Sequence, residues 1–406
     1  PLSPVWLVLG SYLLFAILGR YALGLGSGVP GQAFLFHMRV KTLDDTLAWM
    51  LLIMIAFAAG AQLHLFLFPA AALPIAFGQS RPYRHGALLV TGAALALLLL
   101  IAGIGVHKIF YRIEYLTNRE SIIYKVGKIL SPLGVATCGY ASLSSEKAFV
   151  RKTAMLVAFI YFVVMFAMAS RMMALAPTLF ALGCFCARPQ SRGVRTILYL
   201  SFLTSPVLVP IPLAMRHLPI KGLIPFTAEL GKIGRIFGVS GVFKHVVGSI
   251  LISFPLTGYV GNGHRLRFDY LLTAANPLPG LFTNWRAIQG RLMVNTFTPY
   301  NGLGELMNYG PTVGVTCYLL LGMYFSHVDR RIRRWMAQGR ALPGLVLFGL
   351  AALLVLMSLQ YNLRTNFRLV YYALGFEATM IIWGEERIGY LSYALRQSYP
   401  GGQEAT

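Results

Sequence analysis

Apolar stretches of about 20 residues recur along the whole chain, and short segments between them carry most of the charged residues. Each stretch is long enough to cross a hydrocarbon core of about 30 Å as an α-helix. The pattern predicts spans at 4–24, 46–78, 86–106, 131–144, 153–170, 172–186, 195–215, 311–327, 341–360 and 366–385. We therefore expect an all-α polytopic membrane protein with about 10 or 11 transmembrane helices.

The stretch at 46–78 has two interpretations. It contains His64, Pro69 and Pro74, so it is either one tilted, kinked helix or two short passes around a tight turn. Two passes would add a span and place the amino terminus on the other side of the membrane. The first apolar stretch has no small-residue cleavage site, so we expect it to be retained as a span.

The connectors between the spans predict a topology. Short basic connectors fall at every second turn, and positive charge favours the cytoplasmic side of a membrane. These connectors are Arg81–Arg84, Lys147–Lys152, Arg188–Arg195 and Arg330–Arg340. The opposite side then holds connector 107–130, the turns near 171 and 364, and a long segment from 216 to 310.

The outer segment 216–310 divides the chain into three predicted parts. Residues 1–215 form an N-terminal transmembrane bundle, and 311–406 form the last transmembrane helices and a cytoplasmic tail. A connector this long is rarely without structure of its own. Apolar and basic positions at helical spacing predict amphipathic helices at 228–237 and 242–252, lying at the membrane surface.

Composition and charge narrow the function. Hydrophobic residues make up 57% of the 406 residues, which excludes a soluble domain with a solvated face. The net charge of +22 is spread over connectors on both sides of the membrane, so we expect no nucleic-acid partner. The outer segment nevertheless contains nine basic residues against three acidic ones. This excess favours a lipid-linked phosphate or diphosphate, with anionic phospholipid binding without chemistry as the alternative.

Arg171 follows Ser170 at an outer turn and lies within apolar sequence that has no acidic residue nearby. A guanidinium near the hydrocarbon boundary costs about 2.5 to 3.5 kcal/mol on insertion scales unless it reaches water or an anion. We therefore expect Arg171 to bind a phosphate. The alternative is an interfacial arginine that extends to the lipid headgroups.

Two further sites lie on the predicted outer side. Arg364 and Arg368 flank the last outer turn, and they share one face if that turn is already helical. Glu305 is the single carboxylate of the glycine-rich phrase 298–314. It is either a base or orienting group for an attacking hydroxyl, or a salt-bridge partner for the arginines.

The sequence predicts neither a metal site nor a cofactor. Asp44 and Asp45 lack further acidic or histidine ligands at useful spacing for a hard cation. The four cysteines lie within or beside spans, without the spacing of a redox or zinc pair. The chain also lacks a phosphate-binding Gly-rich loop with Lys and Ser/Thr, and a dinucleotide-binding fingerprint.

Three of these features, in this order, resemble the Wzy-type O-antigen and oligosaccharide repeat-unit polymerases. They are Ser170-Arg171 at an outer turn, the phrase Pro299–Gly314 closing a large late outer loop, and Arg364 at the last outer turn. The resemblance covers most of the chain in architecture. It implies a GT-C-like helical bundle in the bacterial inner membrane, with an active site that faces the periplasm.

The same resemblance implies the reaction and its residues. A sugar hydroxyl of one repeat unit attacks the anomeric carbon of a glycan on undecaprenyl diphosphate, and the lipid diphosphate leaves. Arg171 and Arg364 are implied as catalytic diphosphate binders, and Glu305 as the base. Further diphosphate contacts are implied for Arg368, Arg291, Arg265, Arg267 and Arg112. Membrane lipids, a chain-length regulator and a flippase are the implied partners, and no cofactor or metal is needed.

Two other functions remain open. An O-antigen ligase would transfer glycan from the same lipid to another acceptor and place a histidine in the large outer loop, where His217, His245 and His264 are candidates. A lipid-linked glycan flippase or other transporter would place acidic groups along its spans. Here Glu377 and Arg20 are the main charged residues within the spans.

Overall fold

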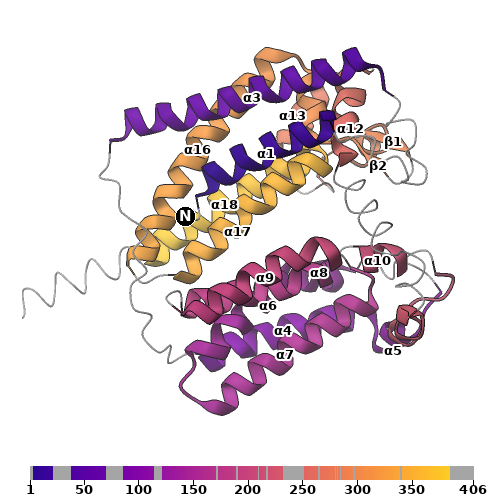
Figure 1. Cartoon of the computed structure of the whole chain (residues 1–406), viewed down its shortest axis with the longest axis vertical. Helices are drawn as coiled ribbons and strands as arrows, with labels where there is room; N and C mark the ends of the chain where they lie inside the picture. The colour runs from indigo at the N-terminus through magenta and orange to yellow at the C-terminus, as the bar shows by residue number, and fades with distance from the viewer. Residues whose placement is uncertain are drawn as a thin grey trace, which may run out of the picture.

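The computed structural model describes residues 3–21, 38–69, 86–113, 121–170, 172–188, 191–208, 210–215, 218–231, 251–263, 266–278, 280, 282–283, 285–295, 298–338 and 341–384. Within these residues the chain is almost entirely helical (Figure 1). The exception is a short antiparallel pair, β1 (Met293–Asn295) with β2 (Thr298–Pro299). The predicted all-α class is therefore confirmed.

One group of helices combines the two ends of the sequence. Its members are α1 (Pro4–Tyr21), α3 (Val40–Leu67), α16 (Pro311–Ala337), α17 (Ala341–Gln360) and α18 (Leu363–Gly384). Their shared core includes Ile53, Phe57, Phe325 and Leu354. The Tyr12 hydroxyl of α1 contacts the hydroxyls of both Tyr318 and Ser358, which joins three of these helices through buried polar groups.

A second group contains the middle of the chain. It consists of α4 (Gly86–Ile104), α6 (Ile122–Ser144), α7 (Ala148–Ala167), α8 (Met172–Ala187) and α9 (Arg192–Leu208). Leu97, Cys138 and Tyr161 lie in its core. Where the two groups meet, Tyr140 and Cys186 pack with Leu345 of α17. The first group thus joins helices from residues 1–215 with helices from residues 311–406, whereas the second group lies entirely within residues 1–215.

Glycines allow the closest helix crossings. A Cβ atom on Gly60 of α3 would lie 1.9 Å from the carbonyl oxygen of Leu319 in α16, and one on Gly322 would lie 2.0 Å from that of Phe57. The second group repeats this arrangement, because a Cβ on Gly139 of α6 would lie 2.0 Å from the Phe180 carbonyl oxygen in α8. Small residues at such crossings let helix backbones approach closely.

The lateral surfaces of both groups are apolar, as expected for helices that face lipid. Trp6 is 71% exposed and Leu88 is also 71% exposed. Among the described residues, α1, α3, α4 and α7 are long and apolar enough to cross a membrane. These helices support an all-α membrane protein, whereas the number of spans and their orientation stay predictions.

Each predicted span overlaps at least one helix, and the bounds differ most at three places. Helix α6 begins at Ile122, well before residue 131, because the Ser121 hydroxyl caps it by accepting a hydrogen bond from the Tyr124 N–H at 3.4 Å. Helix α16 continues to Ala337, so residues 330–337 of the predicted basic connector are helical; no glycine or proline interrupts them, and their side of the membrane stays a prediction. Helix α3 passes unbroken through His64, and residues 70–78 lie outside the described part.

The segments predicted for the outer side gather at one end of the molecule (Figure 1). They include α5 (Val106–Phe110), α12 (Ser253–Gly261), α13 (Phe268–Ala275), α14 (Trp285–Gln289) and α15 (Gly302–Asn308). Helix α10 (Pro210–Met215), which ends the predicted span 195–215, lies at the same end. An isolated bridge between Arg112 and Lys221 ties connector 107–130 to segment 216–310. Of the two predicted amphipathic helices, residues 228–231 are helical and 232–250 lie outside the described residues.

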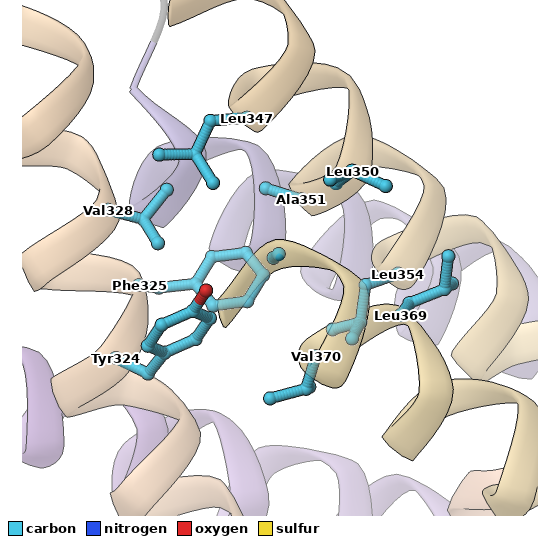
Figure 2. Close-up of a pocket in the computed structure, with 10 residues that line it drawn as sticks. Tyr324, Phe325, Val328, Leu347, Leu350, Ala351, Leu354, Leu369 and Val370 are labelled. Atoms are coloured by element: carbon cyan, nitrogen blue, oxygen red, sulfur yellow. The ribbon is translucent and has the colours of Figure 1, made fainter. Parts of the chain in front are cut away.

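A small cavity lies among α16, α17 and α18 (Figure 2). Its volume is about 10 Å³, and apolar side chains such as Phe325, Leu350 and Leu354 line it. A space of this size barely admits one water molecule, which would need two to four polar partners to be stable. The Tyr324 hydroxyl is the one polar side-chain group drawn there, so the cavity is a packing defect and carries no ligand chemistry.

Candidate functional site

Asn301 fixes the start of α15, at the end of the molecule where the outer segments gather. Its side-chain oxygen caps the helix by accepting a hydrogen bond from the Gly304 N–H at 3.1 Å. Its amide nitrogen lies 2.6 Å from the Thr257 hydroxyl, 3.1 Å from the Ser253 carbonyl oxygen and 3.3 Å from that of Leu359. One buried amide therefore joins α12, α15 and the end of α17.

The turn between α17 and α18 packs directly against α15. The Gly302 N–H donates to the Tyr361 carbonyl oxygen at 2.8 Å. A Cβ atom at Gly302 would lie 2.2 Å from the side-chain nitrogen of Asn366 in α18, so a larger residue at 302 would displace this buried amide. On the other side of α15, the indole N–H of Trp49 in α3 donates to the Leu303 carbonyl oxygen at 3.3 Å.

Glu305 lies inside this junction with its side chain only 1% exposed. One carboxyl oxygen accepts a hydrogen bond from the Leu363 N–H at 3.2 Å, and the other has no hydrogen-bond partner among the described residues. Burial raises the pKa of this carboxyl to about 8, against a small opposing effect of the Leu363 hydrogen bond. The carboxyl is therefore mostly protonated at pH 7.

No basic group in the described part of the chain lies within ion-pair distance of Glu305. Of the two interpretations of this residue, the salt-bridge partner therefore has no support in these residues.

Two other buried polar atoms near the junction also lack described hydrogen-bond partners: the Tyr309 hydroxyl, at the end of α15, and the Asn366 side-chain oxygen. Burial, followed by the proximity of Glu305, raises the pKa of Tyr309. Unpaired buried polar atoms are costly in free energy. Three of them surround this one short helix, which makes the junction the candidate ligand site.

Arg364 follows Leu363 at the start of α18, and it is 1% exposed. Its guanidinium donates to the carbonyl oxygens of Thr273 and Leu278, the latter at 2.8 Å, and to the Thr283 hydroxyl at 3.1 Å. It also lies 4.9 Å from the ring centre of Trp285, which is a cation–π distance. In this arrangement Arg364 holds residues 273–285 against α18, while its Nε has no hydrogen-bond partner among the described residues.

Three other candidate arginines, Arg368, Arg291 and Arg267, are more accessible than Arg364. Arg368 is half-buried one turn after Arg364 within α18, so the condition for a shared face is met. Arg291 is exposed and donates to the Tyr270 hydroxyl at 3.2 Å. Arg267 is 73% exposed and pairs with Asp269 at 3.2 Å. Segment 266–300 therefore presents guanidinium groups on the same side of the molecule as Glu305.

Arg112 belongs to the second packing group. It is 5% exposed, donates to the Lys108 carbonyl oxygen at 3.1 Å and lies 5.9 Å from the ring centre of Phe226. Arg171 and Arg265, and the histidines at 217, 245 and 264, lie outside the described residues. Just before Arg171, the turn is tight: Ala169 has a φ of 49°, and the Ser170 carbonyl oxygen accepts from the Met173 N–H at 2.9 Å.

The sequence analysis missed the residues that assemble the junction. Asn301 carried a usable signal, since an Asn directly before a Gly-Leu-Gly-Glu helix start is a preferred cap. Tyr309 and Asn366 carried none, because their burial depends on contacts between distant segments. Arg20, which the sequence placed within a span, pairs with Asp44 at 2.7 Å.

No protein-family model, curated protein or solved structure matches this chain. The chemistry of the site therefore has to be inferred from its own residues. These are a buried carboxyl, two further unpaired polar groups, and a set of arginines on adjoining elements.

Proposed function

We propose that this chain is a membrane glycosyltransferase that polymerises oligosaccharide repeat units linked to undecaprenyl diphosphate. The observation that carries the proposal is Glu305, a buried carboxyl without a basic partner among the described residues, placed beside the turn that bears Arg364. The basic outer segment and the resemblance to Wzy-type polymerases add to it. On this proposal the site faces the periplasm of a bacterial inner membrane.

Glu305 would act as the general base. A sugar hydroxyl oxygen attacks the anomeric carbon of the donor glycan, the bond from that carbon to the diphosphate oxygen breaks, and the hydroxyl proton passes to the carboxylate. With a pKa of about 8, roughly one molecule in ten is ionised at pH 7. That fraction is a stronger base than an ordinary carboxylate, and its pKa lies near the working pH, as efficient general bases require.

The arginines would stabilise the departing diphosphate. Negative charge grows on the phosphate oxygens as the glycosidic bond breaks, so donors that bind this charge more tightly in the transition state increase the rate. Exposed Arg291 and Arg267 and half-buried Arg368 are available for direct contact. Arg364 would position residues 273–285, because its donors are bound to that segment. Direct contacts from Arg171, Arg265 and Arg112 stay predictions.

The test is glycan chain length on synthetic undecaprenyl-diphosphate repeat units, with purified full-length protein in detergent. We expect a ladder of products from the wild type and a loss of about 100-fold or more in rate for Glu305→Gln, within the usual range for removing a general base. Glu146→Gln is the matched control, since Glu146 is an exposed acid between α6 and α7. Arg171→Ala should also lose the ladder if that arginine binds diphosphate.

The outcomes separate the alternatives. A ladder from Glu305→Gln equal to that of the wild type would contradict the proposed base. A single transfer that occurs only with an added core acceptor would identify a ligase. Movement of the lipid-linked glycan across proteoliposome membranes, with no glycan product in any assay, would identify a transporter.

A further inference from the structure

A larger pocket lies between α3 and α16, at the opposite end of α16 from the Glu305 junction. Its volume is about 510 Å³. Residues His64 and Phe68 line it from the α3 side, and residues between Met323 and Arg334 line it from α16. Arg330 lies 19 residues after Pro311, which is about 28 Å along a helix. The α3–α16 pocket is thus about one hydrocarbon thickness away from α15.

The mouth of this pocket is strongly basic. Arg330, Arg331 and Arg334 line it, and 330 and 334 are one helical turn apart, where like charges repel each other. The guanidinium of Arg330 donates to the Phe68 carbonyl oxygen, which holds it at the end of α3. The nearby acid Asp329 pairs at 2.8 Å with Arg333, which does not line the pocket. Asp329 therefore does not neutralise the lining arginines by that contact.

The titratable groups deeper in the pocket are held by hydrogen bonds. Glu377 of α18 is 5% exposed, and it accepts from the Tyr324 hydroxyl at 3.2 Å and lies 2.9 Å from His327 Nε2. His64 Nδ1 lies 3.0 Å from the Ser326 hydroxyl. Each oxygen of Glu377 thus contacts a lining residue, Tyr324 or His327, and the described contacts of this acid are with these residues rather than with the lining arginines.

The remaining described residues of the lining add apolar surface. Phe68, Met323 and the ring of Tyr324 line the pocket beside the arginines. A fully hydrated inorganic anion gains nothing from such a surface, whereas a phospholipid places a phosphate next to glycerol and acyl carbons. The pocket also lies where the apolar helix α3 ends, and the end of a membrane-spanning helix is where lipid headgroups would lie.

We propose that the α3–α16 pocket binds the phosphate of an anionic phospholipid, with Arg330 and Arg334 as its ligands and Phe68 and Met323 against its glycerol and first acyl carbons. Arginine suits this role because its planar fork pairs with phosphate oxygens and keeps its charge. The proposal does not depend on glycosyl transfer, since it concerns the other end of the molecule.

Native mass spectrometry of the full-length protein in detergent tests the site. Phosphatidylglycerol, phosphatidylcholine of the same acyl chains and, in a separate arm, sodium phosphate are titrated into the wild type and Arg330→Gln/Arg334→Gln. We expect the wild type to prefer phosphatidylglycerol, and the variant to bind it about thirtyfold more weakly, or roughly fivefold for each arginine lost. Arg192→Gln/Arg195→Gln is the matched control, because both residues are exposed on α9.

Equal phosphatidylglycerol binding by the wild type and the pocket variant would overturn the proposal, as would an equal loss in the α9 control. Binding of sodium phosphate without phosphatidylglycerol would overturn the lipid assignment. A second variant, Met323→Trp, fills the pocket without changing its charge. It should also reduce phosphatidylglycerol binding, and retained binding would again contradict the site.

Discussion

The arginines of the Glu305 junction and of the α3–α16 pocket are used in different ways. At the junction, Arg364 of α18 is buried and donates to two carbonyl oxygens and a hydroxyl from residues 273–283. At the pocket, Arg334 of α16 is exposed, and Arg330 has one described carbonyl partner. The difference is in the number of protein acceptors available. An arginine surrounded by backbone oxygens becomes part of the fold, whereas one beside a cavity keeps donors for a ligand.

The largest effect expected from this comparison is on stability. Arg364→Ala should reduce the free energy of unfolding by about 3 to 5 kcal/mol, because it leaves two carbonyl oxygens and a hydroxyl without their donor and opens a cavity next to Trp285. Arg334→Ala should change it by less than about 0.5 kcal/mol, as surface substitutions usually do. Thermal unfolding in detergent measures both. Similar losses in the two variants would mean that the contrast between buried and exposed arginines is wrong.

A smaller effect concerns the crossing that shapes the pocket. Gly60→Ala should cost about 1 to 3 kcal/mol, because its Cβ would lie 1.9 Å from the Leu319 carbonyl oxygen and force α3 away from α16. It should also weaken phosphatidylglycerol binding, since His64 lies one turn further along α3. Gly92→Ala on α4 is the control, as nothing lies within 4 Å of its Cβ position. Unfolding that is unchanged by Gly60→Ala would show that the crossing can relax.

The smallest effect, taken over a single pH unit, is a pH dependence at the Glu305 junction. The pKa of Glu305 is raised from 4.5 to about 8, so its protonated form is favoured by folding. The stability from this group is complete below about pH 4.5 and is lost as the pH rises towards 8, by at most about 1.4 kcal/mol per pH unit. Glu305→Gln should flatten unfolding curves over this range. A wild type that is equally stable at pH 5 and pH 8 would contradict the buried carboxyl.

The sequence predicts the helices well because a membrane span is a local property. Apolar runs locate the long helices, whereas α16 extends beyond its predicted span 311–327 for a simple reason. The positive-inside rule concerns the side of the membrane on which basic residues lie and not whether they are helical; arginines are good helix formers, so α16 continues through 330–337. The positive-inside rule accounts for Arg330 and Arg334 by their charge alone. The pocket that these two residues line was therefore not predicted from the sequence.

The candidate site was only partly predictable. Glu305 and Arg364 stand out as charges in apolar surroundings, and both lie at the junction of α15 with the turn between α17 and α18. The partners of Arg364 could not be anticipated, because the carbonyl groups of Thr273 and Leu278 leave no mark in a sequence. The role of Asn301 likewise depends on Ser253 and Leu359, which are distant from it along the chain.

Asn301 has a consequence for the order in which the protein is made. Its partners Ser253 and Thr257 leave the ribosome before it, but Leu359 follows only after α16 and most of α17 have been synthesised. Gly302 and Glu305 likewise wait for Tyr361 and Leu363. Segment 216–310 therefore cannot complete these contacts until α17 and the first residues of α18 have been synthesised. A chain that ends before these residues would contain Glu305 but could not bury it in this junction.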